Sequence, residues 1–398
     1  MVAWINQVQI VAPAKKAAPH PSDYPSSGSC KTYENMTLHP YMWTNARFVG
    51  GFSEASVPLE ARIPAVQDFR DEPLKDASAS RARMKGRYLF AGPVWNHFGH
   101  ILTDSLHRLW PVLDQPEAYD GIIFLQVPNL RPPKDGVAKI PQLALDMMKL
   151  MRIPDGIPKL YVTEPTRVDQ LDIPVIGSSR HFGVRKFYRP YLERYQENIS
   201  RSVKTLMEKA PRKLFYSRSH SLRDGGVLGI SYFEEQMRSR GFVSCVPEEM
   251  SLKLQLSYVL AAEEIVFEEG SAIHITDILS SFPGRAHMLR RRSSSEGFST
   301  TLMPRAGHFT DLVAPGNVRY LPDRNGNMSP ASLTLYANPE EVANSLRQQD
   351  LPIGDFDEGL YNKIERRDLG RCPSHSEQAK KKRLSQLQSH QGARSGLI

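Results

Sequence analysis

Cysteine is scarce in this sequence, whose 398 residues include only three: Cys30, Cys245 and Cys372. They are far apart, odd in number and without the short spacing of a zinc site, so they indicate neither a disulfide framework nor a cysteine metal centre. Sequences without a disulfide framework are typical of reducing compartments. The sequence therefore predicts a cytoplasmic protein.

Long apolar runs are also missing. No stretch approaches the roughly 20 apolar residues that a membrane-spanning helix needs. The first residues, 1–7, lack the basic segment and apolar core of a signal peptide. We therefore expect neither a transmembrane helix nor a secretion signal.

Several catalytic and nucleotide-binding motifs are absent from the sequence. The lack of G-x-G-x-x-G and of a Walker P-loop argues against a dinucleotide-binding protein and against a nucleoside triphosphatase. The lack of G-x-S-x-G argues against a serine hydrolase. Without H-E-x-x-H or a cysteine cluster, a catalytic metal has little support. We accordingly expect no metal and no cofactor.

Acidic residues are in deficit, with 43 Asp and Glu against 51 Lys and Arg, which gives a formal net charge of +8. Most of this excess lies from Arg366 onward in a Ser- and Gln-rich segment, so the rest of the chain is close to neutral. The basic segment contains no interleaved aromatic residues, which argues against nucleic-acid binding. We predict that residues 367–398 form a disordered basic tail that contacts anionic lipid headgroups.

Short apolar strands alternate with helices in two regions, 31–210 and 211–335. Such alternation predicts βαβ units and parallel sheets. We therefore expect an α/β fold with two consecutive domains over these ranges. Residues 1–30, of which 11–30 are rich in Pro, Ala, Ser and Lys, should form an irregular arm, and residues 336–366 a C-terminal helical segment.

Residues 94–110 carry the densest group of side chains suited to catalysis. If a helix begins near Asn96, a residue type that caps helices well, four polar side chains share one of its faces at about 100° per residue: His97, His100, Asp104 and Arg108. The opposite face is apolar, as in a helix that packs on a sheet. Such groups after a strand are typical of ligand sites in α/β proteins, whereas an ordinary solvated face is the alternative.

The second region contains a strand that ends in an arginine. Ser217, Arg218 and Ser219 follow the apolar run 213–216. The guanidinium of Arg218 is suited to bind phosphate oxygens in a forked geometry, and the serine hydroxyls add donors. A surface ion pair is the alternative.

A second junction in that region also suits an anion. The strand 264–267 passes through Gly270 into a predicted helix near Ser271, whose first turn has unpaired N–H groups. Gly270 would let a ligand approach the backbone, and Glu269 could accept hydrogen bonds from sugar or ribose hydroxyls.

Together these pieces resemble glycosyltransferase family 61, and in particular its bacterial branch associated with capsule and other surface polysaccharides. The resemblance rests on blocks that occur in the same order: Asn96-His97-Phe98-Gly99-His100 with Asp104 and Arg108, then Leu214-Phe215-Tyr216-Ser217-Arg218, then Pro247-Glu248-Glu249-Met250-Ser251-Leu252, and then Glu269-Gly270-Ser271-Ala272-Ile273-His274.

The resemblance implies a GT-B fold, in which two Rossmann-like domains face each other across a cleft. It also implies transfer of a sugar, with inversion, from a nucleotide-sugar donor to a glycan or lipid-linked acceptor, without a bound metal. The first domain, 31–210, would then lie on the acceptor side, and the second, 211–335, would bind the donor.

The resemblance also assigns roles to individual residues. His100 and Asp104 would face the acceptor as a catalytic base and its orienting partner, in an order that the sequence leaves open. The acceptor side would also include Asn96, His97 and Arg108. The donor would be bound by Ser217, Arg218, Glu269, Gly270, Ser271, Ala272 and His274.

The sequence departs from the family at Glu268-Glu269-Gly270, where many members have a Gly-x-His-Gly turn. This difference puts the donor contacts in doubt. It motivates an alternative, in which the protein has the same fold but binds a nucleotide sugar or glycan without catalysis.

Overall fold

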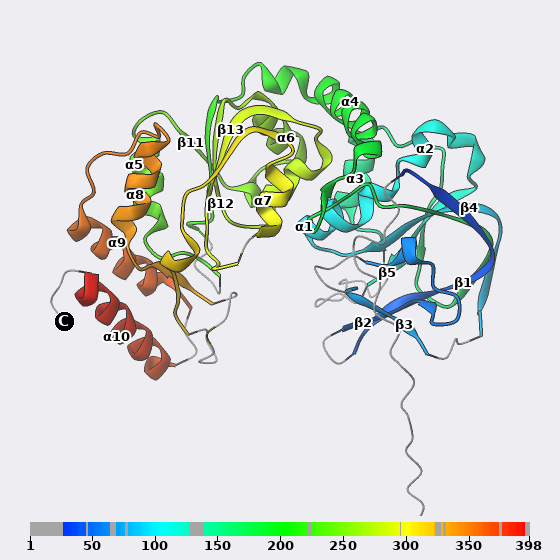
Figure 1. Ribbon diagram of the computed structural model, residues 1–398, viewed down its shortest axis with the longest axis horizontal. Helices are drawn as coiled ribbons and strands as arrows, with labels where there is room; N and C mark the ends of the chain where they lie inside the picture. Colours follow the sequence, from blue (N-terminus) through cyan, green and yellow to red (C-terminus); the bar gives the residue numbers. More distant parts are fainter. Residues whose placement is uncertain are drawn as a thin grey trace, which may run out of the picture.

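The structure is a computed structural model (Figure 1). It describes residues 27–394 apart from 45–46, 64–68, 76–78, 128–138, 221–224, 295, 323–327, 329–331 and 374–375. Most of the predicted N-terminal arm, residues 1–30, therefore lies outside the described residues. Two lobes are visible, with helix α4 (Arg189–Met207) passing from one to the other.

The N-terminal lobe is built on a mixed sheet. Among the described residues its seven strands are β1 (Cys30–Thr44), β2 (Arg47–Ser53), β3 (Asp71–Leu74), β4 (Ala82–Val94), β5 (Gly121–Gln126), β6 (Lys159–Val162) and β7 (Thr166–Pro174). Their order is β3-β2-β1-β7-β4-β5-β6, and β1 runs antiparallel to both of its neighbours. Strands β7, β4, β5 and β6 pair in parallel as predicted, but the antiparallel pairs of β1 make the whole sheet mixed, so the prediction of a Rossmann-like parallel sheet holds for only part of this lobe. Polar residues separate the apolar ones along β1, so no continuous apolar run revealed this strand.

The C-terminal lobe contains a fully parallel sheet. Its strands in the described part of the chain are β10 (Lys213–Tyr216), β11 (Val243–Cys245), β12 (Glu264–Glu268), β13 (Phe282–Leu289) and β14 (Ala306–Asp311). They are arranged β11-β10-β12-β13-β14 with parallel pairing throughout. Numbered from β10, this order is 2-1-3-4-5, a doubly wound arrangement whose direction switches between β10 and β12. Ligands of such sheets bind outside the carboxyl ends of the strands at that point.

Helices and short turns connect these strands. In the N-terminal lobe they are α1 (Phe98–His100), the π-helical turn η3 (Ile101–Ser105), the 3₁₀ turn η4 (Leu106–Arg108), α2 (Pro111–Asp114) and α3 (Gln142–Leu150). In the C-terminal lobe they are α5 (Ile230–Arg238), α6 (Leu252–Ala261), the 3₁₀ helix η8 (Ser271–Ile278), α7 (Glu296–Leu302) and α8 (Pro339–Gln348). No helix in the described part of the chain is long and apolar enough to cross a membrane.

One hydrophobic cluster joins the two lobes. It includes Leu106 from the N-terminal lobe, Tyr195 from α4 and Ile273 from η8, each of which is fully buried. Because apolar surface is removed from water on both sides of the junction, the cluster holds the two lobes together. It thereby positions α1 and η8 against each other.

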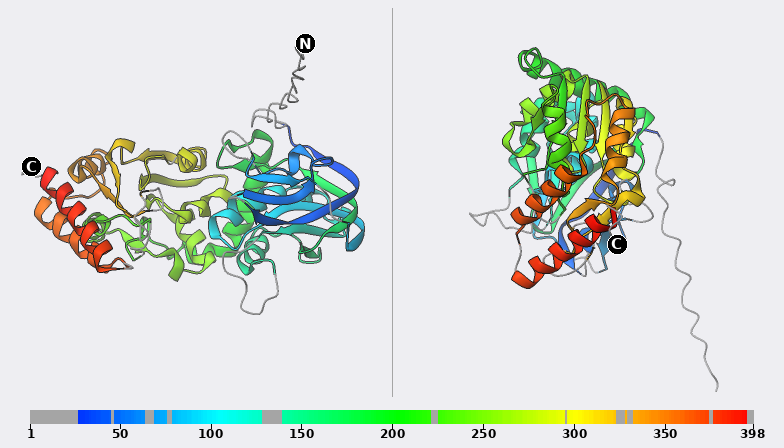
Figure 2. Two further views of the ribbon diagram at one scale, coloured as in Figure 1. Left: turned by 90° about the horizontal axis from the view of Figure 1, so that it is seen from below. Right: turned by 90° about the vertical axis from the view of Figure 1, so that its left-hand side faces the viewer.

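The C-terminal tail is ordered over most of its length. Helices α9 (Glu358–Arg371) and α10 (Glu377–Arg394) pack together at the end of the C-terminal lobe farthest from the N-terminal lobe (Figures 1 and 2). The prediction of disorder over 367–398 is therefore wrong for α10. Its charged composition suggested disorder, but residues at helical spacing form one face that packs against the rest of the lobe. These residues are Arg383, Leu387, Gln391 and Arg394.

This packing predicts a specific loss of stability. Leu387 is fully buried, so Leu387→Ala should lower the free energy of unfolding by about 2–5 kcal/mol through lost burial and a residual cavity. The control is Leu384→Ala at a side chain that is 38% exposed on the same helix, which should cost below about 1 kcal/mol. Urea titration measures both. Equal and negligible effects would show that α10 does not pack as described.

Candidate active site

A cavity of about 280 Å³ lies between the lobes. Its C-terminal wall is formed by residues that directly follow β10, β12 and β13, which is the carboxyl edge of the parallel sheet next to the direction switch. The lining residues are His97, Gly99, His100, Thr103, Arg180, Arg218, Ser271, His274, Arg291, Arg292 and Phe298. The cavity therefore occupies the position where sheets of this order bind ligands.

The charge of this cavity is of one sign. Every titratable side chain in its lining is an arginine or a histidine, with four guanidinium groups among them. Burial, followed by the neighbouring Arg292, lowers the pKa of Arg291 to about 10, so that side chain is still cationic at neutral pH. Clustered guanidinium groups bind phosphate and carboxylate oxygens in forked geometry. The cavity is therefore suited to an anion with several oxygens.

Arg218 lies directly across Gly270. A Cβ atom at residue 270 would be 2.8 Å from Cδ of Arg218, so glycine makes room for this arginine. The backbone N–H of Arg218 donates to Oε2 of Glu268 at 2.7 Å, and burial raises the pKa of that carboxyl to about 7. We expected Gly270 to let a ligand approach the backbone. The Arg218 side chain occupies that space instead, so Gly270 makes room for an arginine rather than for the ligand.

Glu269 stands behind the cavity and organises its rim. It is fully buried, and its Oε2 accepts hydrogen bonds from the backbone N–H groups of Arg291, at 2.9 Å, and Arg292, at 3.0 Å. The expectation that Glu269 contacts sugar hydroxyls does not fit this placement. Its carboxylate instead fixes the turn that presents two arginines.

Two other predicted donor residues also lie outside the cavity. Ser217 is fully buried, and its hydroxyl donates to Oε2 of Glu234 at 2.8 Å. Ala272 belongs to the hydrophobic cluster that joins the lobes. Of the seven predicted donor-site residues, the structure brings Arg218, Ser271 and His274 to the cavity wall.

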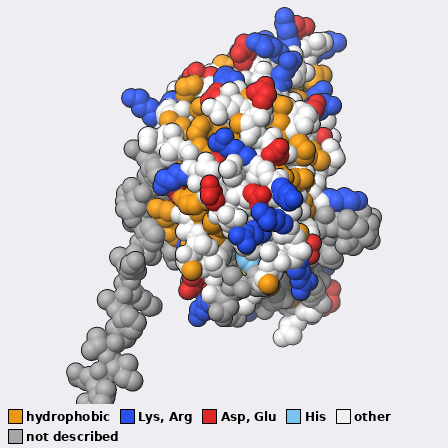
Figure 3. Space-filling model, turned by 90° about the vertical axis from the view of Figure 1, so that its right-hand side faces the viewer, with side chains coloured by type: hydrophobic (Ala, Val, Ile, Leu, Met, Phe, Trp, Pro, Cys, Tyr) orange, Lys and Arg blue, Asp and Glu red, His pale blue; other side chains and the backbone are white. Residues whose placement is uncertain are grey.

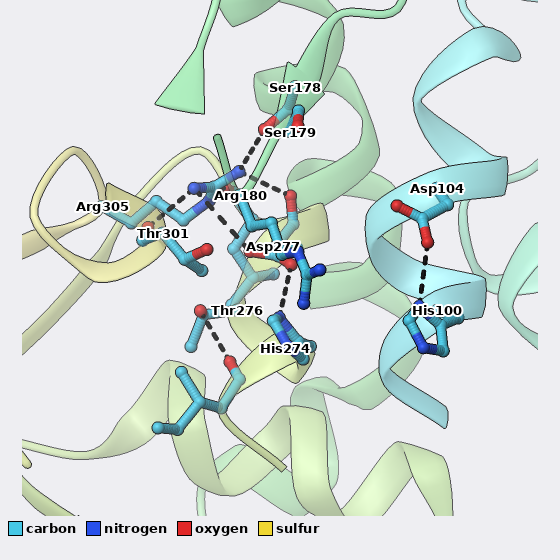
Figure 4. Close-up of polar contacts among 12 residues, drawn as sticks. His100, Asp104, Ser178, Ser179, Arg180, His274, Thr276, Asp277, Thr301 and Arg305 are labelled. Carbon is cyan, nitrogen blue, oxygen red and sulfur yellow. Dashed lines mark hydrogen bonds and ion pairs between the residues drawn. The ribbon is translucent and has the colours of Figure 1, made fainter. Parts of the chain in front are cut away.

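On the opposite wall, His100 is oriented by a carboxylate. Its Nδ1 lies 2.9 Å from Oδ2 of Asp104 (Figure 4), and Nη1 of Arg70 donates to the same oxygen at 3.2 Å. Burial alone would raise the pKa of Asp104, but the His100 hydrogen bond and the Arg70 charge hold it well below its usual range. Asp104 therefore stays ionised, and it is buried behind His100 rather than facing the cavity.

The protonation of His100 follows from this environment. Burial is the main cause that lowers the pKa of His100, so the imidazole is neutral at neutral pH. Because the Asp104 carboxylate accepts a hydrogen bond, the ring proton resides on Nδ1 and Nε2 is the basic nitrogen. His100 can therefore act as a general base through Nε2.

The predicted regular helix is interrupted, and this changes the face it presents. Three helical residues, α1, are followed by a π turn and then by a 3₁₀ turn. A π turn closes i→i+5 hydrogen bonds, so residues after it are rotated from their α-helical positions. The helix also begins after His97, and Asn96 is an exposed residue outside the cavity lining.

Arg108 is the residue most displaced by this interruption. It is buried, and its guanidinium donates to the backbone carbonyls of Glu60, Arg62 and Pro174. The prediction that Arg108 shares a face with His97 and His100 is therefore wrong. Its side chain ties neighbouring segments of the N-terminal lobe together.

A second histidine–aspartate pair stands on the C-terminal wall. Nδ1 of His274 lies 2.9 Å from Oδ2 of Asp277, and Nη2 of Arg305 donates both to the Asp277 carbonyl, at 2.9 Å, and to Ser178 Oγ of the other lobe, at 3.1 Å. In Figure 4 the Arg180 side chain lies between this pair and the His100–Asp104 pair. A Cβ atom at Gly99 would be 2.7 Å from Cδ2 of His274, so glycine allows the two walls to meet.

Sequence reasoning missed part of this site. Arg291 and Arg292 belong to a run of three arginines after an apolar strand. Such a run could have indicated an anion-binding site at the end of that strand. Arg180 and Phe298 are in short irregular or polar segments without a recognisable pattern. Their place in the cavity depends on how the lobes pack.

Comparison with protein families gives a match over residues 98–280, to the family described as Glycosyltransferase 61. The match covers a little under half of the chain. It begins at α1 and ends just after η8, so it includes His100, Arg218 and His274 from both walls of the cavity. The chain is therefore similar to this glycosyltransferase family over the segment that contributes to both walls of the cavity. Comparison with curated proteins gives no match.

The contact between Gly270 and Arg218 can be tested directly. Gly270→Ala should push the guanidinium out of place and weaken binding of inorganic pyrophosphate about tenfold, which corresponds to about 1.4 kcal/mol. Isothermal titration measures the affinity. Gly316→Ala is the matched control, because its added methyl group meets nothing within 4 Å. Unchanged affinity in Gly270→Ala would remove Arg218 from the binding site.

Proposed function

We propose that this protein is an inverting glycosyltransferase that moves a sugar from a nucleotide-sugar donor to a glycan acceptor. The observation that carries the proposal is the composition of the cavity, in which every titratable side chain of the lining is an arginine or a histidine. One of these histidines, His100, is held through its Nδ1 by the ionised Asp104 carboxylate, which leaves its Nε2 as the basic nitrogen. The family match supports the reaction class.

The donor diphosphate is assigned to the C-terminal wall. Arg218, Arg291 and Arg292 provide guanidinium groups there, and Ser271 provides a hydroxyl at the start of η8. His274 faces the same space and completes this donor site. The parallel sheet and the position of the cavity at its direction switch agree with a GT-B arrangement, which we propose for the two lobes.

His100 is assigned as the general base. As the acceptor hydroxyl oxygen attacks the anomeric carbon, its proton passes to Nε2 of His100. The bond between that carbon and the diphosphate oxygen breaks, and the electron pair leaves with the nucleoside diphosphate. Asp104 positions the ring and stabilises the imidazolium that forms. Attack from the side opposite the leaving group inverts the anomeric configuration.

The negative charge that develops on the leaving diphosphate needs a counter-charge. Preorganised guanidinium groups in a partly buried site provide it without solvent reorganisation. Within the described residues, no group of three or more His, Cys, Asp or Glu side chains is placed to hold a metal ion. We propose that the arginines serve in place of a metal.

The cellular setting belongs to the same proposal. We assign the protein to surface polysaccharide synthesis at the cytoplasmic side of a membrane, on the basis of its resemblance to the capsule-associated branch of the family. Exposed Lys380, Lys381 and Lys382 on α10 are suited to anionic headgroups. The acceptor would then be a glycan or a lipid-linked glycan.

Removing the base tests the reaction assignment. In His100→Ala, release of nucleoside diphosphate from a panel of nucleotide sugars, with glycan acceptors present, should fall about 10²–10⁴-fold. Nucleotide binding should persist, because the cationic wall is intact. His308→Ala, at an exposed histidine of β14, is the control and should keep wild-type turnover.

Two outcomes would contradict the assignment. Near-normal turnover in His100→Ala would exclude His100 as the base. Binding of nucleotide sugars by the wild-type protein, with no turnover of any of them, would favour the alternative of a non-catalytic binding protein.

A further inference from the structure

We propose that Trp43 and Phe48 form a stacking platform for sugar rings of the acceptor, connected to the catalytic base through Trp95. This inference rests on the proposed function, because it names where the acceptor of that reaction binds. The two rings lie on neighbouring strands, where Trp43 of β1 pairs with Phe48 of β2, and they meet edge to face.

The exposure of Trp43 is the first observation. Trp43 is 55% exposed and Met42 beside it is 52% exposed, which makes them the most exposed large apolar residues described in the N-terminal lobe. A large apolar side chain in solvent gains nothing from burial, and the exposed Trp43 ring contacts Phe48, so the two rings together offer an aromatic surface to a ligand. Figure 3 shows the outer face of this lobe, where Lys and Arg are interspersed with Asp and Glu and with scattered hydrophobic side chains.

A continuous series of ring contacts connects the platform to the base. The ring centroids of Trp43 and Phe48 are 4.6 Å apart, and those of Phe48 and Trp95 are 5.3 Å apart in a stacked geometry. Trp95 in turn contacts His100 with a centroid distance of 4.1 Å. The platform is thus built against the residue that supports the catalytic imidazole.

Trp95 is held firmly at the centre of this series. The guanidinium of Arg70 lies 4.7 Å from its ring centroid, and Arg70 also pairs with Asp104. Trp95 is only 6% exposed, and its indole N–H is buried without a hydrogen-bond partner in the described part of the chain. An unpaired buried donor costs roughly 1–3 kcal/mol. Retaining this indole is therefore consistent with a functional role that outweighs its cost to stability.

The chemistry of the platform fits a carbohydrate. A pyranose ring has an apolar C–H face and a polar rim, so an aromatic ring can cover the face while the hydroxyls stay hydrated. The two rings carry no charge, in contrast to the arginine-lined cavity assigned to the donor. Acceptor and donor would therefore be distinguished by opposite surface chemistry on the two lobes. Sugars that bind here are remote from the reacting hydroxyl and contribute binding energy.

The test uses an array of immobilised oligosaccharides probed with wild-type protein, Trp43→Ala and Trp43→Phe. Trp43→Ala should bind the oligosaccharides recognised by the wild type at least about tenfold more weakly, whereas Trp43→Phe keeps an aromatic face and most of the affinity. Leu360→Ala, at a residue 43% exposed on α9, is the control and should bind normally. Thermal melting checks that each variant is folded.

Several results would overturn the inference. The first is that Trp43→Ala and the wild type bind the oligosaccharides equally well. The second is that the wild type binds no oligosaccharide on the array. A third is loss of binding to phosphatidylglycerol vesicles in Trp43→Ala with glycan binding unchanged, which would identify a lipid-binding surface. The inference and the proposed function fail separately, because binding of nucleoside diphosphates, which needs only the arginine-lined cavity, should be the same in Trp43→Ala and the wild type.

Discussion

The central constraint in this structure is the repulsion among four guanidinium groups that line one small cavity. Placed together without partners, they would repel one another and resist burial. Buried acids stand directly behind three of them: Glu268 accepts from the backbone of Arg218, and Glu269 accepts from the backbones of Arg291 and Arg292. The negative charge of these acids reduces the repulsion among the arginines, whose guanidinium groups still face the cavity. The remaining positive charge is available to an anionic ligand.

This arrangement explains why the departure from the family pattern at Glu268-Glu269-Gly270 is compatible with a donor site. The two acids are structural supports, and the small Gly270 gives Arg218 its place. On the other wall, the same principle applies to the orientation of His100, which depends on Asp104 and, through it, on Arg70, while burial keeps the imidazole neutral. Each wall therefore presents a functional group that is positioned by a buried acid.

The sequence predicted the features that depend on local order. Apolar strands followed by polar residues placed Arg218, Ser271 and His274 correctly at the carboxyl edge of a parallel sheet, and the spacing of His100 and Asp104 paired them correctly. Prediction from the sequence failed for features whose position depends on contacts between distant parts of the chain. The π turn moved Arg108 away from the site, and the polar strand β1 pairs with residues far along the chain. The inward face of α10 was hidden by its charged composition, and Arg180 reaches the cavity only because the lobes pack together.

The account depends most directly on the affinity of the cavity for a nucleoside diphosphate, which is both a fragment of the proposed donor and the leaving group. Isothermal titration of a panel of nucleoside diphosphates against the wild type, Arg218→Ala and Arg292→Ala measures it. We predict that at least one binds the wild type, that affinity falls as salt is raised, and that each substitution weakens binding at least about tenfold. Absence of binding by the whole panel, or affinity that neither arginine affects, would contradict the account.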